Sequence, residues 1–208
     1  MRRTKEEAAV TRQTILEAAL HIFGSKGYSA TRLEDIAEAA GVTRGAVYWH
    51  FQNKAQLYNT LVIDMSSRVF EEVIGQAMSE GGSYLDMFKR IHTRVLDMVE
   101  RYPEMRAIME LVSHKVEEGI PELAETFQTK VEIVQDAVRQ GAEFLEQGIN
   151  EGILRSDLDA FDMAWAWQAF REGVTQLWLQ NPSGFSLIQK APTLVDIYLR
   201  GIVKSDPK

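Results

Sequence analysis

The sequence predicts an all-α protein of about nine helices. Apolar residues recur with helical spacing along most of the chain, and no convincing period-two alternation, as expected of strands, interrupts them. Proline is absent from the first hundred residues, and Pro103, Pro121 and Pro182 stand between later apolar segments. A chain of 208 residues that is 45% hydrophobic and 25% charged can form one or two compact domains and is not wholly disordered.

The N-terminal elements are predicted one by one from their apolar faces and ends. Apolar residues at i, i+3, i+4, i+7 and i+8 between 15 and 23 indicate an amphipathic first helix. Gly27 is typical of the left-handed residue that closes a helix. Thr31, followed three residues later by Glu34, has the pattern of a capping box and predicts a short second helix, which Gly41 ends.

The remaining elements follow from caps and prolines. Thr43 can cap a third short helix that reaches about His50, and Asn53 with Gln56 predicts a longer helix to about Ser79. Further helices are expected at roughly 83–101, 104–118, 121–151, 158–180 and 186–204. The helix after Asn53 joins two regions, so we expect an N-terminal domain of residues 1–54 and a C-terminal domain of residues 55–208.

Composition excludes several classes of protein and site. The absence of cysteine removes disulfides, thiol nucleophiles and cysteine-held metals. The N-terminus has no apolar stretch of a secretory signal, and the longest uncharged run, 173–189, is too short and polar to cross a bilayer, so a cytoplasmic protein is expected. Glu110, His114 and Glu118 are spaced for a metal, but a surface ion-pair ladder is the favoured interpretation. We therefore expect no enzyme, cofactor or metal.

Charge is distributed unevenly. Residues 1–54 carry 8 basic and 6 acidic side chains, whereas the rest carries 15 basic and 24 acidic ones, within a net charge of −7. A mildly basic N-terminal region on an acidic chain favours local contact with a polyanion.

A helix-turn-helix is predicted from 33–40, the turn at 40–43 and 44–50. Spacing of this kind is common in all-α proteins, so DNA binding must be argued from the side chains. Arg44 can read guanine with two hydrogen bonds, Gly45 and Ala46 allow close approach, and hydroxyl and imidazole groups can hold phosphates. Lys54 and Thr31 lie at starts of helices, where phosphates are favoured. The expected DNA-binding residues are Thr31, Arg32, Thr43, Arg44, Gly45, Ala46, Tyr48, His50 and Lys54.

This segment resembles the DNA-binding domain of the TetR family of repressors. The resemblance covers about residues 12–58 and rests on the run V-T-R-G-A-V-Y-W-H-F-x-N-K-x-x-L, which begins at Val42. It implies that Arg44, Gly45 and Tyr48 contact bases, and that Thr31, Thr43, Tyr48, His50 and Lys54 hold phosphates. Trp49 is expected to be structural, packing where the two regions meet.

A second resemblance concerns the C-terminal region. The stretches 106–115 and 152–160, followed by a tryptophan-containing helix, resemble the AcrR/TtgR-like branch, the repressors of multidrug efflux pumps.

The helix at 158–180 has two apolar faces, which indicates cover on both sides. We expect one face, with the last helix, to form a homodimer interface. Its residues would be Trp167, Phe170, Val174, Leu177, Trp178, Leu194, Tyr198 and Ile202.

The other face carries polar residues beside an aromatic one. Trp165, Gln168, Glu172 and Gln176 would orient a ligand, or they are solvated or pair across the dimer. The efflux-repressor resemblance favours a pocket, where Gly141 would make room for a ligand. The other walls would come from Met65, Phe88, Ile91, His92, Met109, Ser113, Val134, Ala137, Val138 and Gly141.

The resemblances imply a homodimeric repressor that binds a palindromic operator and is released by lipophilic or aromatic compounds. Its expected target is a multidrug efflux pump. Two alternatives stay open at this point: a regulator of a metabolic operon that responds to an acyl-CoA or a catabolic intermediate, and a protein with no DNA role.

Overall fold

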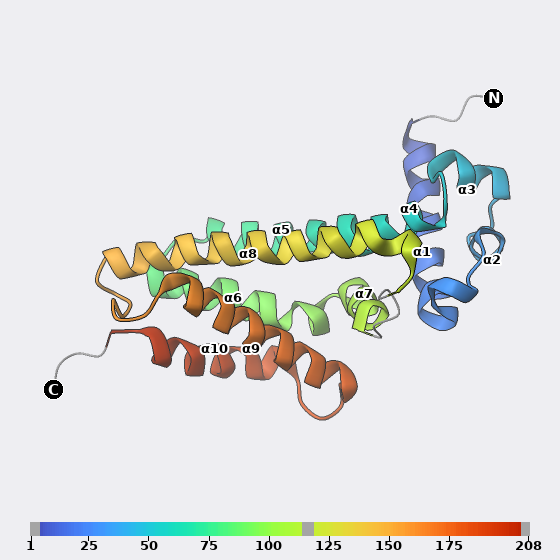
Figure 1. Ribbon diagram of the computed structural model, residues 1–208. Coiled ribbons are helices and arrows are strands. Elements are labelled where there is room, and N and C mark those ends of the chain that lie inside the picture. The colour runs from blue at the N-terminus through green and yellow to red at the C-terminus, as the bar shows by residue number, and fades with distance from the viewer. Residues whose placement is uncertain (1–4, 114–118, 205–208) are drawn as a thin grey trace. The chain divides into compact units, whose positions relative to one another are not determined.

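The computed structural model describes residues 5–113 and 119–204. The elements are α1 (Lys5–Ala30), α2 (Leu33–Ala39), α3 (Arg44–His50), α4 (Lys54–Asn59), a π-helical segment η1 (Thr60–Met65), α5 (Ser66–Ser79), α6 (Tyr84–Arg101), α7 (Pro103–Ser113), a 3₁₀ turn η2 (Pro121–Leu123), α8 (Ala124–Asn150), α9 (Ala160–Gln180) and α10 (Leu187–Ile202) (Figure 1). Within these residues the only strand-like pairing is one isolated bridge between Leu154 and Val203. The predicted all-α class is confirmed.

The chain divides into two compact units, each described by itself. Unit 1 comprises the described residues up to Arg68 and those between Glu104 and Thr129, and unit 2 comprises Val69–Pro103 and the described residues from Lys130 onward. Among the described helices, none is long and apolar enough to cross a membrane.

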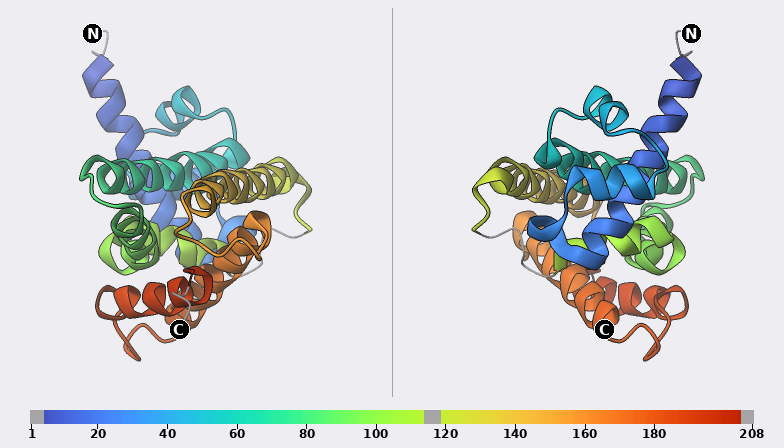
Figure 2. Two further views of the ribbon diagram at one scale, coloured as in Figure 1. Left: turned by 90° about the vertical axis from the view of Figure 1, so that its left-hand side faces the viewer. Right: turned by 90° about the vertical axis from the view of Figure 1, so that its right-hand side faces the viewer.

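The core of unit 1 is built around α1. Ile15, Ala19 and Phe23 are fully buried on the face predicted from their spacing, and they meet Ile36 of α2 and Val47 of α3. Figure 2 shows α2 and α3 as short helices grouped beside the longer α1, in agreement with their contacts. The first helix is interrupted at the predicted residue, Gly27, and its φ of 75° is positive as predicted. Its ψ of 164° is extended instead of left-handed helical, a conformation that essentially only glycine adopts, and α1 continues to Ala30.

Two of the three predicted helix caps are confirmed. The Ala46 N–H donates to Thr43 Oγ1 at 3.2 Å, and the Gln56 N–H donates to Asn53 Oδ1 at 2.8 Å. The capping box predicted at Thr31 is wrong by one residue. The Thr31 hydroxyl donates instead to Gly27 O at 2.7 Å, and Asp35 accepts from the Arg32 N–H at 3.1 Å at the start of α2.

The helix predicted after Asn53 contains an irregularity that the pattern does not reveal. Residues 54–79 are helical throughout, but Thr60–Met65 have π-helical hydrogen bonding. The Ser66 hydroxyl donates back to Val62 O and to Ile63 O. If α4, η1 and α5 are taken as one interrupted helix, the described chain matches the expected nine.

Unit 2 is organised by α6, which packs against α9 and α10. Asp159 and Ser186 cap α9 and α10 within a residue or two of the predicted starts. The interior between these helices and α8 is an aromatic cluster, in which neighbouring ring centroids lie between 3.8 and 6.5 Å apart. We use this name for Tyr84, Phe88, His92, Phe144, Trp167, Phe170 and Tyr198.

Candidate nucleic-acid interface

The helix-turn-helix is formed by α2, the turn at Gly41 and α3. Gly41 has a φ of 64°, the left-handed conformation that a glycine adopts without strain. Val47 and Phe51 are buried against the core of unit 1, which turns the opposite side of α3 toward solvent. Short α3 therefore presents one fixed outer face, as a recognition helix requires.

Arg44 is the most elaborately held side chain on that face. Its side chain is 62% exposed, and its Nη1 lies 2.8 Å from Glu34 Oε1 of α2. Its Nη2 donates to the Tyr48 hydroxyl at 3.3 Å, and the guanidinium lies 5.3 Å from the centre of the Tyr48 ring. The hydrogen bond to Tyr48 and the charge of Glu34 raise the pKa of Arg44 above its usual value. The outer face thus carries a permanent cation whose direction is already restricted.

Gly45 is not required by the fold. A Cβ atom built at Gly45 would meet only Thr43 Oγ1, at an ordinary distance of 3.9 Å. Among the described residues nothing therefore explains a glycine here, where alanine would favour the helix. The absence of a side chain is consistent with the predicted close approach to base edges.

Two residues predicted to hold phosphates are engaged inside the protein. Thr31 is 2% exposed and its hydroxyl is used by Gly27 O, so it has no free surface for a phosphate. The Lys54 ammonium donates to Tyr28 O at 2.8 Å and Thr31 O at 3.0 Å. These contacts use the Thr31 hydroxyl and two of the three donors of the Lys54 ammonium, and the predicted phosphate contacts of the two residues stay predictions.

The other predicted contacts lie at or near the surface. Arg32 is exposed, and Thr43, Ala46 and His50 lie along or beside α3. Trp49, which was expected to be structural, is 72% exposed, and its ring meets His50 edge-on at 4.5 Å. A large exposed aromatic on this helix is a further candidate contact.

The residues predicted to form the ligand pocket are distributed over both units. Met65, Met109 and Ser113 belong to unit 1. Phe88, Ile91 and His92 of α6, Val134, Ala137, Val138 and Gly141 of α8, and Trp165, Gln168, Glu172 and Gln176 of α9 belong to unit 2. The pocket itself stays a prediction. Of the proposed metal-spaced residues, Glu110 accepts from Arg106 at 2.8 Å, and His114 and Glu118 lie outside the described residues.

His92, one of the predicted ligand contacts, has a pKa well below its usual value. Its ring stacks on Phe88 at 3.8 Å and meets Trp167 edge-on at 4.4 Å, while Nδ1–H donates to Phe88 O at 2.8 Å. Burial lowers the pKa of His92 to about 4, against a smaller opposing effect of the hydrogen bond. At neutral pH this side chain is an uncharged aromatic.

The glycine of α8 that makes room for another group is Gly148 and not the predicted Gly141. A Cβ at Gly141 would make an ordinary 3.7 Å contact with Ala164, so Gly141 leaves no special space. A Cβ at Gly148 would lie within 2.5–2.7 Å of the Tyr84 ring, whose hydroxyl donates to Phe144 O. Gly148 therefore accommodates the Tyr84 ring of the aromatic cluster.

The residues predicted for the dimer interface mostly point into unit 2. Trp167, Phe170 and Tyr198 are members of the aromatic cluster, while Val174 and Leu194 are half-buried. Trp178 is 2% exposed, with its Nε1 donating to Phe185 O, and Ile202 is also buried. These two have almost no surface left for a partner, whereas Leu177 is 63% exposed.

The opposite side of α9 is the exposed one. Phe161 and Trp165 are exposed there, and the next two positions at four-residue spacing, Ala169 and Gly173, are exposed as well. Because residues four apart are offset by only about 40° around a helix, these four residues form an apolar stripe, which we call the α9 stripe. Sequence reasoning assigned Trp165 to the pocket and missed the stripe.

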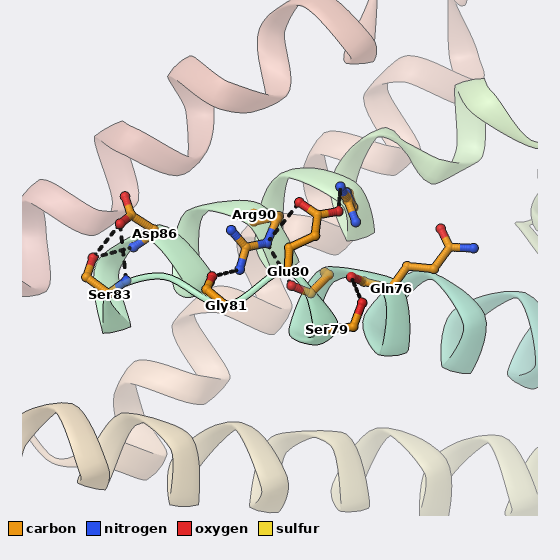
Figure 3. Close-up of polar contacts among 9 residues, drawn as sticks. Gln76, Ser79, Glu80, Gly81, Ser83, Asp86 and Arg90 are labelled. Carbon is orange, nitrogen blue, oxygen red and sulfur yellow. Dashed lines mark hydrogen bonds and ion pairs between the residues drawn. The ribbon is translucent and has the colours of Figure 1, made fainter.

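A charged surface depression at the α5–α6 turn was not predicted. It is lined by residues between Glu80 and Arg94. Arg90 donates to Ala77 O at 2.7 Å and to Gly81 O, and Arg94 pairs with Glu80 (Figure 3). Ser83 and Asp86 cap α6. These side chains neutralise one another and fix the turn, so the depression offers no free charge for a ligand.

The geometry of unit 1 defines a helix-turn-helix DNA-binding protein. Comparison with known proteins supports the same class. Residues 15–61 match the family described as bacterial regulatory proteins, tetR family, and residues 83–203 match the C-terminal region of MAATS-type transcriptional repressors. The chain belongs to the TetR family, in the AcrR/TtgR-like branch.

Three relatives illustrate the similarity. The probable acrEF/envCD operon repressor of Escherichia coli is 34% identical over 203 residues, which covers 96% of this chain and 90% of the relative. TtgR of Pseudomonas putida is 34% identical over 197 residues, covering 94% and 93%. The solved structure of NalD, described as the secondary repressor of the MexAB-OprM multidrug efflux pump in Pseudomonas aeruginosa, is 28% identical with a TM-score of 0.78, covering 97% and 100%.

Proposed function

We propose that this protein is a ligand-responsive transcriptional repressor of a multidrug efflux operon. The observation that carries the proposal is the outer face of α3, where an exposed Arg44 is oriented beside a glycine that the fold does not need. The relatives add the target, because NalD is described as a repressor of a multidrug efflux pump and the Escherichia coli relative as a repressor of an operon.

The DNA-binding function is assigned to residues 1–54, and the ligand-binding and dimerisation functions to residues 55–208. Arg44 and Tyr48 would contact bases, and Gly45 and Ala46 would allow the approach. Thr43, His50 and the exposed Arg32 would contact phosphates, with Trp49 beside the backbone. Thr31 is buried and its hydroxyl is used internally, so it is assigned no phosphate, whereas Lys54 keeps one ammonium donor for a phosphate.

A homodimer is part of the proposal, since two recognition helices about 34–36 Å apart are needed to read a palindromic operator. We assign the interface to the α9 stripe in place of the buried face. Burying Phe161 and Trp165 between two copies would remove apolar surface from water, and Ala169 and Gly173 would let two helices approach closely.

The proposed ligand is an uncharged lipophilic or aromatic compound. Support comes from the aromatic cluster, whose histidine, His92, is neutral at physiological pH. Aromatic walls favour stacking over charge recognition and tolerate several ring systems.

One observation favours the alternative, a metabolic operon controlled by an acyl-CoA or a catabolic intermediate. The Arg171 side chain is only 14% exposed, donates to Gln168 Oε1 at 3.3 Å and lies 3.6 Å from Glu172 Oε2. A buried guanidinium with few partners is suited to an anionic group.

Fluorescence anisotropy tests the proposal directly. The protein is titrated against DNA from upstream of its own gene and against scrambled DNA at physiological salt, with and without a panel of lipophilic drugs and dyes. Specific binding that several unrelated neutral compounds release is expected. Release only by anionic compounds would favour the metabolic alternative, and equal binding to both DNAs would contradict the proposal.

A further inference from the structure

Arg171 is a charged residue on the buried face of α9 in unit 2. Ala164, Thr175 and Trp178 lie four or seven positions from it, and each is at most 5% exposed. Residues at these spacings share one face of a helix. The Arg171 side chain is accordingly only 14% exposed, whereas the side chain of the next residue, Glu172, is 53% exposed. A permanently charged guanidinium therefore lies within the helical packing of unit 2.

The contacts of this guanidinium use few of its five N–H donors. Its Nε donates to Gln168 Oε1 at 3.3 Å, and its Nη2 lies 3.6 Å from Glu172 Oε2, which is beyond hydrogen-bonding distance. No other described residue accepts a hydrogen bond from Arg171. In the same part of the chain, the sole buried side-chain polar atom without a partner is Asn59 Oδ1. Both Nη atoms of Arg171 therefore border accessible space and are not sealed in the packing.

Arg90 of α6 shows how a guanidinium of similar burial is held in a structural role. Its side chain is 18% exposed, and it donates to Ala77 O at 2.7 Å and to Gly81 O. Two carbonyls therefore fix Arg90, whereas no carbonyl of the described residues accepts from Arg171. The backbone of unit 2 does not need Arg171 in the way that it needs Arg90.

The charge of Arg171 is only partly neutralised. Burial lowers the pKa of Arg171 and the charge of Glu172 opposes this effect, but a guanidinium keeps its proton at neutral pH. Glu172 also accepts from Gln176 Nε2 at 3.2 Å and is half exposed to water, which weakens its attraction for Arg171. A carboxylate is the group that best completes such a site, because its two oxygens match parallel N–H groups of a guanidinium.

The neighbours of Arg171 favour an acid with an aromatic body. Trp167, a member of the aromatic cluster, lies four residues before Arg171 on the same face of α9. His92 meets the Trp167 ring edge-on at 4.4 Å, and burial lowers its pKa to about 4, so it adds no competing charge at neutral pH. Flat aromatic groups pack favourably against rings arranged in this way.

We propose that Arg171 binds the carboxylate of aromatic acids, which adds this class of ligand to the uncharged compounds that unit 2 is proposed to accept. The carboxylate accepts hydrogen bonds from Nη1 and Nη2, Gln168 holds Nε, and the aromatic body lies toward Trp167. This site rests on the proposed ligand-responsive function for its effect on DNA, but binding of the acid to the free protein is independent of DNA.

The first experiment compares acids with their uncharged amides on the free, full-length protein. Benzoate, cinnamate and naphthoate, each with its amide, are titrated by isothermal titration calorimetry at neutral pH. At least one acid should bind wild type about tenfold more tightly than its amide. Arg171→Met should lose this preference, and Arg139→Met, which removes an exposed charge from α8, should keep it. Absence of the preference in wild type, or its persistence in Arg171→Met, would overturn the proposal.

The second experiment changes an exposed side chain and predicts a gain. Glu172→Gln removes the carboxylate that shares Arg171, so the acid should bind severalfold more tightly while the amide is unaffected. Glu143→Gln, which removes an exposed acid from α8, controls for overall charge and should leave both affinities unchanged. Acid binding in Glu172→Gln that is no tighter than in Glu143→Gln would contradict the site.

Urea unfolding distinguishes a binding role of Arg171 from a structural one. Arg171→Met should unfold at no lower urea concentration than wild type, because its contacts are few and its charge is only partly paired. Arg90→Met should unfold at a clearly lower concentration, since it leaves two carbonyls without their donor. A loss of stability in Arg171→Met as large as that in Arg90→Met would assign Arg171 to the fold and overturn the proposal.

Anisotropy with operator DNA then separates the site from the proposed function. Release of the DNA by the acid from wild type, but not from Arg171→Met, supports both. Binding of the acid to the free protein without release of DNA keeps the Arg171 site and contradicts the ligand-responsive function. Release by neutral compounds, with no binding of any acid, contradicts the Arg171 site alone.

Discussion

The helix-turn-helix of unit 1 and the aromatic cluster of unit 2 use polar groups in opposite ways. In unit 1, Thr31 and Lys54 donate to backbone carbonyls, and Thr43 and Asn53 cap helices. In unit 2, His92 is held between aromatic rings with one backbone hydrogen bond, and Arg171 has one hydrogen bond to a side chain and one distant ion pair.

This difference fits two tasks. Backbone-directed hydrogen bonds fix helices against one another, which a surface that reads DNA requires. The His92 imidazole and the Arg171 guanidinium are instead held mainly by aromatic rings and by side chains, so their positions depend on packing. Such an environment is suited to a region proposed to accept a ligand, and four predictions test whether the two regions differ in this way.

The largest expected effect concerns the pH dependence that His92 causes in unit 2. Its native pKa of about 4 is below the unfolded value of 6.5, so between these pH values the unfolded chain binds the extra proton. The unfolding free energy should therefore fall as pH drops through this window, by on the order of 3 kcal/mol in full. Urea unfolding of wild type and His92→Leu measures it. The exposed His21→Gln is the control, and an unchanged profile in His92→Leu would contradict the assignment.

Arg44→Ala should mainly affect DNA recognition by unit 1. Removing the guanidinium should cost about 1–3 kcal/mol of discrimination between operator and scrambled DNA. Unfolding should change little, because the side chain is exposed. Competition anisotropy with both DNAs provides the measurement, and Arg200→Ala, an exposed arginine of α10, provides the control. Operator binding equal to wild type would refute the assignment of α3 as the recognition helix.

Gly45→Ala should separate folding from DNA binding. The new Cβ meets only Thr43 Oγ1 at 3.9 Å, so the variant should be stabilised by up to about 1 kcal/mol through helix propensity. Operator affinity should fall on the order of tenfold, about 1.4 kcal/mol, because the methyl group occupies the space needed by a base edge. Gly24→Ala in α1, equally free of neighbours, should keep full affinity. If Gly45→Ala binds operator normally, the close approach is disproved.

The smallest effect is expected for Glu34→Gln. The 2.8 Å ion pair between Arg44 and Glu34 is exposed and screened by solvent, so it adds little to stability. Removing the carboxylate frees Arg44 and lowers the repulsion of phosphates, so DNA affinity should rise by up to about fivefold, about 1 kcal/mol. Anisotropy titrations against Glu38→Gln, an exposed acid on the same helix, measure the gain. Weaker binding would mean that the pair orients Arg44 productively.

Much of the helix-turn-helix could be predicted because its determinants are local. Thr43 and Asn53 cap helices through residues only three positions away, and the apolar spacing of α1 identifies its buried face. Two predictions in this region differ from the structure, each for its own reason. Thr31 found an acceptor at Gly27 O in place of α2, and Trp49 remained exposed although its apolar character suggested burial.

The C-terminal region was less predictable because α9 is apolar on both faces. Hydrophobicity gave no reason to choose Trp167 over Trp165 for the interior, and the choice depends on α6 and α10, whose Phe88 and Tyr198 join Trp167 in the aromatic cluster. Gly148 was missed for the same reason, since the ring that occupies its space belongs to Tyr84, 64 residues earlier in the sequence.

The sequence by itself determined the order of the helices, the caps at Thr43 and Asn53, and the outer face of α3, because these depend on residue chemistry within a few positions. Tertiary structure alone decided that Lys54 serves the Tyr28 and Thr31 carbonyls, that Tyr28 reaches Glu122, and that Trp165 faces outward. Those outcomes depend on distances between atoms from remote parts of the chain. Packing of whole helices fixes such distances, and no local pattern encodes them.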